Sequence, residues 1–253
     1  MQNRYVADVG DFVKFSILRE LIGEPPRMRV GVAWWLFPDE DHNRDGGHRQ
    51  YLRDPDKWRR FDPVLFDALK KINDGDKLDV LAIQKANLFQ GARFAPDLIP
   101  CDLLPYTQRP LERKRWFSKV KDDLKGCDLV FLDPDNGIAS DGLRLTLRRA
   151  GKSVTLEEIA ELAENRATVV YHHQTHRKGG HRDEIPYQAD RLRKYGLRVT
   201  CALRARPGSS RFFFILNGDA ELQKRAKGIA ERWKGEDKIA WHSCMKESVA
   251  QPD

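Results

Sequence analysis

Two carboxylates and an amide follow an apolar run near the middle of the chain. Leu129 to Leu132 reads LVFL, and residues 133–137 read DPDNG. An apolar run without alternation is typical of a strand covered on both faces, and DPDNG has the composition of a turn. Ligands of open α/β sheets bind where strands end. The candidate catalytic residues are therefore Asp133, Pro134, Asp135 and Asn136. An ordinary polar turn is the alternative interpretation, because the same residue types fill turns throughout proteins.

Histidines gather after another apolar run, at residues 167–171. His172, His173 and His176 lie in this segment. If the two runs are neighbouring strands, these imidazoles face Asp133 and Asp135 across one crevice. Such a group could hold a divalent metal that activates water for phosphodiester hydrolysis. No recognised metal-binding spacing such as HExxH is present, and a basic loop that contacts phosphate explains the histidines equally well.

The charge balance favours an anionic partner. Lys and Arg number 45 against 38 Asp and Glu, which gives a net charge of +7. Basic residues cluster at 113–115, 144–152, 177–182 and 204–211, and three of these clusters follow predicted strands. Arginine and lysine on phosphate would position RNA or DNA there without reading its sequence. Arg177, Lys178 and Arg182 are the candidate substrate-binding residues. The alternative is four unrelated solvated loops.

Cysteine usage and the N-terminus predict a cytoplasmic protein. The four cysteines are far apart, without a CxxC pair, and Cys127 and Cys201 lie in apolar runs. These features favour buried, reduced thiols over a disulfide framework or a zinc site. The first residues contain no apolar signal segment, and no apolar run is long enough to span a membrane.

Alternating strands and helices position these candidates. Periodicity predicts helices over residues 9–22, 62–72, 111–124, 155–165, 184–195 and 219–233. It predicts strands over residues 28–37, 78–83, 129–132, 167–171, 197–203 and 211–216. The link at 204–210 is too short for a crossover, so the last two strands form an antiparallel hairpin. We therefore expect one α/β domain over residues 1–253 with a small helical insertion near 45–75. Its sheet is expected to be mainly parallel, Rossmann-like and covered by helices on both faces.

A parallel sheet that ends in one antiparallel strand resembles the fold of class I S-adenosylmethionine-dependent methyltransferases. Within that fold, the chain is similar to the bacterial family that methylates an adenine amino group in large-subunit ribosomal RNA. Residues 10–14, GDFVK, resemble the Ala-Asp-Val-x-Lys motif of its first helix, and residues 132–136, LDPDN, resemble its Asp-Pro-Pro-Tyr motif. Residues 210–217, SRFFFILN, are similar to its last strand.

The resemblance implies a nucleic-acid methyltransferase that uses S-adenosylmethionine. Asp11 and Lys14 match the family's helix motif, and Gly46 and Gly47 lie in the loop where a cofactor would bind. Asp133, with the carbonyl of Pro134, would accept the hydrogens of the adenine amine.

The chain departs from the family pattern at three places. Its first strand ends in residues 35–38, WLFP, where the family has an acidic residue followed by a Gly-rich loop, and Gly46 and Gly47 come late. Asp135 and Asn136 replace the second proline and the aromatic residue that hold the flipped base, so Tyr171 is a candidate substitute for stacking. Gln84 stands where an acidic residue would bind the cofactor ribose, if residues 78–83 are the second strand. A metal-dependent nuclease or phosphodiesterase and a non-catalytic nucleic-acid-binding protein remain the alternatives.

Overall fold

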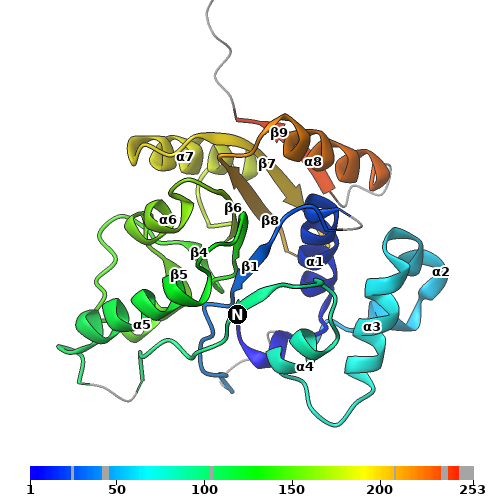
Figure 1. Cartoon of the computed structure of the whole chain (residues 1–253), viewed down its shortest axis with the longest axis horizontal. Coiled ribbons are helices and arrows are strands. Elements are labelled where there is room, and N and C mark those ends of the chain that lie inside the picture. Colours follow the sequence, from blue (N-terminus) through cyan, green and yellow to red (C-terminus); the bar gives the residue numbers. More distant parts are fainter. Residues whose placement is uncertain (24–25, 42–45, 103–104, 208, 235–238, 245–253) are drawn as a thin grey trace, which may run out of the picture.

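Seven strands form one mixed sheet in the computed structural model of the chain (Figure 1). The structure describes residues 1–23, 26–41, 46–102, 105–207, 209–234 and 239–244. The strand order is β2-β1-β3-β6-β8-β7-β9. These strands are β1 (Val30–Ala33), β2 (Arg93–Ala95), β3 (Leu129–Leu132), β6 (Ala167–His173), β7 (Val199–Ala205), β8 (Arg211–Leu216) and β9 (Ile239–Ser243). The two-residue strands β4 (Gly137–Ile138) and β5 (Ser153–Val154) form a separate parallel pair.

The sheet has a parallel half and an antiparallel half. The strands β2, β1, β3 and β6 pair in parallel, and β3 lies between β1 and β6 as expected of a run covered on both faces. The pairs β6–β8, β8–β7 and β7–β9 are antiparallel. The predicted hairpin at 197–216 is confirmed, but β8 inserts between β6 and β7, and β9 forms the edge. The sheet is therefore mixed but mostly parallel, because β2, β1, β3, β6 and β7 run in one direction and β8 and β9 run in the other.

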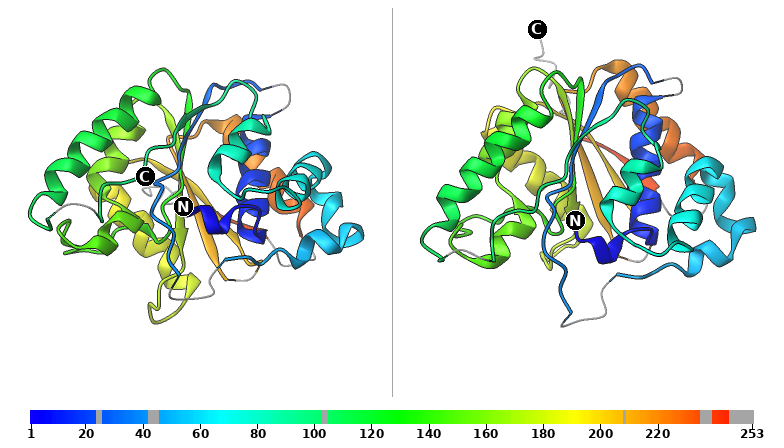
Figure 2. Two further views of the ribbon diagram at one scale, coloured as in Figure 1. Left: turned by 90° about the horizontal axis from the view of Figure 1, so that it is seen from below. Right: turned by 60° about the horizontal axis from the view of Figure 1, so that its bottom comes forward.

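Helices cover both faces of the sheet (Figure 2). The described α-helices are α1 (Val9–Ile22), α2 (Pro55–Trp58), α3 (Pro63–Asn73), α4 (Val80–Lys85), α5 (Arg109–Asp123), α6 (Leu156–Ala163), α7 (His181–Lys194) and α8 (Ala220–Arg232). Short 3₁₀ helices lie at Asn3–Tyr5, Gln50–Arg53, Arg59–Phe61 and Arg148–Lys152. Helices α1, α3, α4 and α8 pack on one face, and α5, α6 and α7 pack on the other. No helix in the described ranges is long and apolar enough to cross a bilayer.

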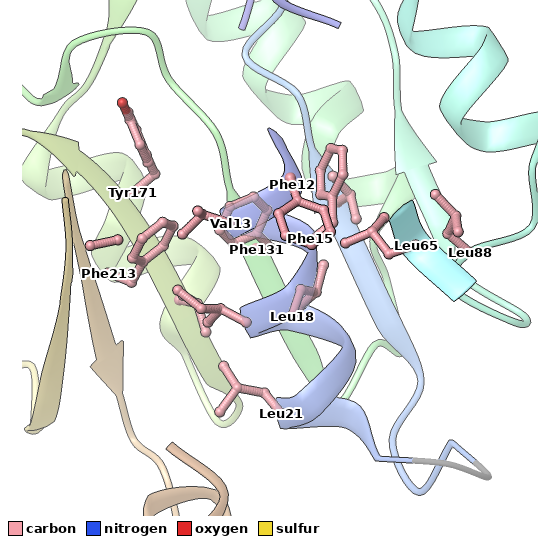
Figure 3. Close-up of a cluster of buried hydrophobic side chains, with 14 of the residues drawn as sticks. Phe12, Val13, Phe15, Leu18, Leu21, Leu65, Leu88, Phe131, Tyr171 and Phe213 are labelled. Carbon is pink, nitrogen blue, oxygen red and sulfur yellow. The ribbon is translucent and has the colours of Figure 1, made fainter. Parts of the chain in front are cut away.

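The central strand alternates between the two cores. Leu129 and Phe131 of β3 face the α1 side, whereas Val130 and Leu132 face the α5–α7 side. Figure 3 shows Phe131 near Phe12 and Phe15 of α1, and Phe213 near Tyr171 in the same apolar cluster. Because both faces of β3 are buried, every residue of the LVFL run is apolar. This burial explains the absence of the period-two pattern that a half-exposed strand shows.

The prediction of a strand at residues 78–83 is wrong. Val80–Lys85 is helix α4, and the Asp79 side chain caps it by accepting from the Ala82 N–H. The second strand is instead Arg93–Ala95. It lies in a segment that prolines divide into short pieces, so the sequence pattern does not indicate a strand there. Gln84 therefore does not follow a strand. Residues 50–73 are helical, as expected for the insertion, and Leu65, Phe66 and Leu69 join the same core as α1.

All four cysteines are free thiols and buried, which confirms the expectation for Cys127 and Cys201. Burial raises the pKa of the Cys201 thiol to about 12. A thiol with so high a pKa is a poor nucleophile. The cysteines therefore belong to the core rather than to a reactive site.

Candidate functional site

The start of α1 meets the end of β3 at the carboxyl edge of the parallel strands. Asp8 caps α1 by accepting from the Asp11 N–H at 3.0 Å. This cap starts the helix so that Asp11 and Lys14 lie one turn apart on the side that faces β3. Asp133 follows β3 directly, and its N–H donates to the carbonyl of Ala33 at 3.0 Å. Two segments more than a hundred residues apart in sequence thereby share one buried site.

Lys14 joins two buried carboxylates. Its Nζ lies 3.1 and 2.9 Å from the two carboxylate oxygens of Asp133, and 2.8 Å from Oδ1 of Asp11. The other Asp11 oxygen accepts from the Ala7 N–H at 3.1 Å, where Ala7 has a left-handed backbone. Burial opposes the charge on Lys14, but Asp11 and Asp133 outweigh it and raise the pKa of the ammonium above its usual range. The resemblance paired Asp11 with Lys14; the structure adds Asp133 to the same cluster.

The cluster contains two carboxylates, Asp11 and Asp133, but one ammonium, that of Lys14. Burial raises the pKa of Asp11 to about 7 against the opposing effect of Lys14, and the nearby Asp8 and Asp133 raise it further. Two carboxylates that share one ammonium cannot both be fully stabilised in a water-poor site. The cluster therefore holds a proton that titrates near neutral pH.

This titration predicts a pH-dependent stability. The unfolded carboxyl has its ordinary pKa of 3.8, so the folded state retains a proton on Asp11 between that value and about 7. The raised pKa stabilises the fold below pH 3.8, and this contribution is lost as the pH rises to about 7. Relative to Asp11→Asn, the free energy of unfolding of the wild type should fall over this range and then level off. Urea denaturation of both proteins from pH 4 to pH 8 measures the difference.

Asp67→Asn is the matched control with the opposite sign. Asp67 is an exposed residue of α3 whose pKa is lowered by hydrogen bonding to Arg59. Its contribution is therefore present above the ordinary carboxyl pKa and is lost only in acid. Parallel curves for the wild type and Asp11→Asn across pH 4–8 would contradict the assignment of a neutral-range proton to Asp11.

The N-terminal residues cover the same edge. The amino group of Met1 donates to the carbonyl oxygens of Asp133 and Trp35 at 2.8 and 3.2 Å, and lies 2.7 Å from Oδ1 of Asp135. Asp135 also accepts a hydrogen bond from Gln2. Burial opposes ionisation, but the amino group and Gln2 lower the pKa of Asp135 below its usual range. Asp135 is therefore an ionised carboxylate held beside Asp133.

A cavity of about 550 Å³ opens over this cluster. Seven of the residues singled out from the sequence line it: Lys14, Gly46, Asp133, Asp135, Asn136, Tyr171 and His173. Asp11 lies behind Lys14. Pro134, Gly47, His172, His176, Arg177, Lys178 and Arg182 do not line this cavity. The structure thus brings together residues from α1, the ends of β3 and β6, and the loop after β1.

Tyr171 presents its hydroxyl, not its ring, to the cavity. Its ring is packed edge-on against Phe213 at 5.7 Å between centroids, and Lys14 Nζ lies 5.5 Å from the ring centre. Figure 3 shows the hydroxyl pointing away from the apolar cluster. The hydroxyl lies 3.3 Å from Nδ1 of His173, and burial raises the pKa of the phenol to about 12. Phe213 and Lys14 both lie against the ring, so a stacked base would share it with them, and the stacking role of Tyr171 stays a prediction.

His172 belongs to a buried network instead of the cavity. Its Nδ1 accepts from the Ile138 N–H at 3.0 Å, so the neutral ring carries its proton on Nε2 and donates to Glu184 at 3.0 Å. Burial lowers the pKa of His172 despite Glu184. His173 lines the cavity, while His176 is exposed. Within the described ranges, no group of three or more His, Cys, Asp or Glu side chains is arranged to hold a metal.

The predicted basic clusters separate in the structure. Arg113, from the 113–115 cluster, is buried against Glu158 at 2.6 Å and supports the packing of α5 on α6. Arg177 and Lys178 are exposed in the loop after β6, and the Arg177 guanidinium lies over the Tyr187 ring at 3.4 Å. Arg182 lines a different cavity, between α7 and β9.

Two cationic residues of the cavity were not singled out from the sequence. Lys152 and Arg211 line it, although each lies within a basic cluster that was recognised as a group. The sequence does not distinguish these two residues from the other basic residues of their clusters, because the fold decides which of them face the cavity.

Comparison of the sequence with models of known protein families finds no match, and comparison with curated proteins finds none either. The fold and the geometry of this site therefore carry the functional argument.

Proposed function

We propose that the protein is a methyltransferase that uses S-adenosylmethionine and acts on a nucleic acid, with an adenine amino group as the favoured acceptor. The observation that carries the proposal is the Lys14–Asp133 pair beneath a cavity of about 550 Å³ at the carboxyl edge of the sheet. A volume of this size suits a nucleoside-sized ligand. The pair joins the two motifs, GDFVK and LDPDN, on which the resemblance rests.

The strand order supports the same class of protein. The fold that the chain resembles has a mainly parallel sheet whose last strand is antiparallel; in this chain the short strand β9 follows β8. Here β8 lies between β6 and β7 and is antiparallel to both. The helix α1, which carries Lys14, precedes the first strand and reaches the end of β3. These features favour a methyltransferase-type sheet over other mixed α/β arrangements.

The chemistry of Asp133 fits a positioning role. An ionised carboxylate has about four lone-pair sites, of which Lys14 engages one on each oxygen. The remaining sites can accept the two hydrogens of an amine and so aim its nitrogen lone pair. Lys14 contacts both oxygens of the carboxylate and fixes its orientation, which is the arrangement that transfer by proximity requires.

The cofactor would supply an electrophilic methyl group on a sulfonium. The amine nitrogen aimed by Asp133 would take this methyl group as its bond to sulfur breaks, and the amine would then release one proton to solvent. Gly46, Asn136 and Asp133 of the cavity wall are the residues of this chain that would contact the bound cofactor or the amine.

Calorimetry with S-adenosylmethionine tests the proposal most directly. We expect a saturable binding heat, and transfer of a labelled methyl group to RNA or DNA when either is added. Binding of nucleic acid without any heat from the cofactor at millimolar concentration would favour a non-catalytic binding protein. Cleavage of the nucleic acid in added Mg²⁺ or Mn²⁺, without methyl transfer, would favour the nuclease.

A further inference from the structure

Arg211 is a buried cation on the far wall of the same cavity. It is the first residue of β8, it pairs in register with His173 of β6, and it is only 9% exposed. Both residues line the cavity. Arg211 is thus held on a central strand of the sheet, not on a mobile surface loop.

Backbone carbonyls are the partners of Arg211. Its Nη1 donates to the carbonyl oxygens of Pro207 and Ser209 at 2.6 and 3.0 Å. Among the residues that the structure describes, no carboxylate lies within ion-pairing distance of it. The Asp8 carboxylate lies near it, since Asp8 Oδ1 and Arg211 Nη2 would both touch a Cβ placed on Gly10, but the two groups form no direct ion pair. A buried cation without a direct ion pair can bind an anionic ligand.

Gly10 lets the Arg211 guanidinium approach the first turn of α1. A Cβ at position 10 would lie 3.0 Å from Nη2 of Arg211 and 2.9 Å from Oδ1 of Asp8. Gly10 is in the first turn of α1, and it lines the cavity together with Val9. The positive end of the α1 dipole therefore adds to the field of Arg211 at this point. Lys152 lines the cavity as well, but its ammonium pairs with Glu40.

We propose that Arg211 binds an oxyanion of the ligand, and that this oxyanion is a phosphate of the acceptor nucleotide. The inference rests on the proposed function. In an open α/β sheet the cofactor takes the crevice next to the first strand, on the β1 side of Asp133. Arg211 lies on the other side of Asp133, beyond β6. A guanidinium has a planar fork of N–H donors, and with Nη1 fixed by backbone it offers Nε and Nη2 to two phosphate oxygens.

The test compares adenosine 5′-monophosphate with adenosine in the full-length protein. We expect the monophosphate to bind the wild type more tightly than adenosine does. Arg211→Gln should weaken monophosphate binding by about 10–100-fold, the range for a lost hydrogen bond to a charged group, and leave adenosine unchanged. Arg211→Lys should retain part of the affinity for the monophosphate, because lysine keeps the positive charge but lacks the planar pair of guanidinium N–H donors. Arg29→Gln is the control, since Arg29 is an exposed arginine paired with Asp128.

Gly10→Ala changes the surroundings of Arg211 Nη2 without removing a charge. This variant tests the proposal even if Arg211→Gln does not fold. Its methyl group should lower monophosphate affinity by crowding Nη2 of Arg211, and because it would also lie 2.9 Å from the Asp8 cap, thermal unfolding of the variant is measured alongside binding. Equal affinities of the wild type for adenosine and its monophosphate would overturn the proposal. A loss of S-adenosylmethionine binding in Arg211→Gln, with 5′-methylthioadenosine unaffected, would overturn the assignment to phosphate in favour of the cofactor carboxylate. Monophosphate binding that depends on Arg211 would stand even if the cofactor gave no heat, so the two proposals can fail separately.

Discussion

Replacing Lys14 by methionine is expected to destabilise the protein by about 3–5 kcal/mol at neutral pH, the range for removing one partner of a buried ion pair. The substitution keeps most of the apolar side chain but leaves Asp133 and Asp11 without their shared ammonium. The pKa of Asp11 then rises further, because Lys14 no longer lowers it, and Asp133 stays buried without its counter-charge. Urea denaturation at pH 7.5 measures the loss. The deficit should shrink in acid, because protonation removes the unpaired charges.

Lys119→Met on α5 is the matched control for Lys14→Met. Its ammonium pairs with Asp97 and Asp123, but the side chain is 55% exposed. Exposed pairs contribute about 0–1 kcal/mol, so this variant should unfold close to the wild type. If Lys14→Met unfolded within about 1 kcal/mol of the wild type at neutral pH, the cluster would not be the buried ion pair described above.

Asp133→Asn should reduce methyl transfer by at least about 100-fold, the loss that follows removal of one preorganised polar group from a reaction site. Asparagine has the shape of aspartate, but its NH₂ group would face either Lys14 or the amine as a second donor. The lone pair of the acceptor nitrogen would then no longer be aimed at the methyl group. Rates with saturating cofactor and nucleic acid measure the effect, and cofactor titration separates it from a binding defect.

Asp128→Asn provides the control on the same strand. Asp128 precedes β3 at the opposite edge of the sheet and pairs with Arg29 in an exposed position. That variant should transfer methyl groups like the wild type. Activity of Asp133→Asn within a few-fold of the wild type would remove Asp133 from the reaction and with it the proposed mechanism.

The sequence predicts the buried centre of this fold better than its edge. The LVFL run of β3 is apolar because both its faces are covered, and that cause is visible in the sequence itself. The strand predicted at residues 78–83 is wrong because the spacing of their apolar residues fits a strand and a helix equally well. Asp79, as the N-cap, starts a helix there. Strand β2 has only three residues and an exposed start, so little apolar surface marks it.

The candidate site is predicted in its parts but not in its connections. Asp133 is marked by turn chemistry, and Lys14 by its likeness to a family motif. Their contact depends on how α1 crosses the sheet, which local patterns do not encode. The same limit explains the histidines: His172 and His173 are adjacent in sequence, but successive residues of a strand face opposite sides. One is therefore in the core beside Glu184, and the other lines the cavity.

The position of β8 also bears on synthesis of the chain. Strands β6 and β7 run in the same direction and are joined through β8, which is made after both of them. A nascent chain that ends before Arg211 therefore holds β6 with one open backbone edge, next to a β7 that lacks its partner. Phe212, Phe213 and Phe214, all fully buried in the finished sheet, must then enter between strands that already exist. Open edges of this kind pair with other chains, so the chain is exposed to aggregation between the synthesis of β7 and the synthesis of β8.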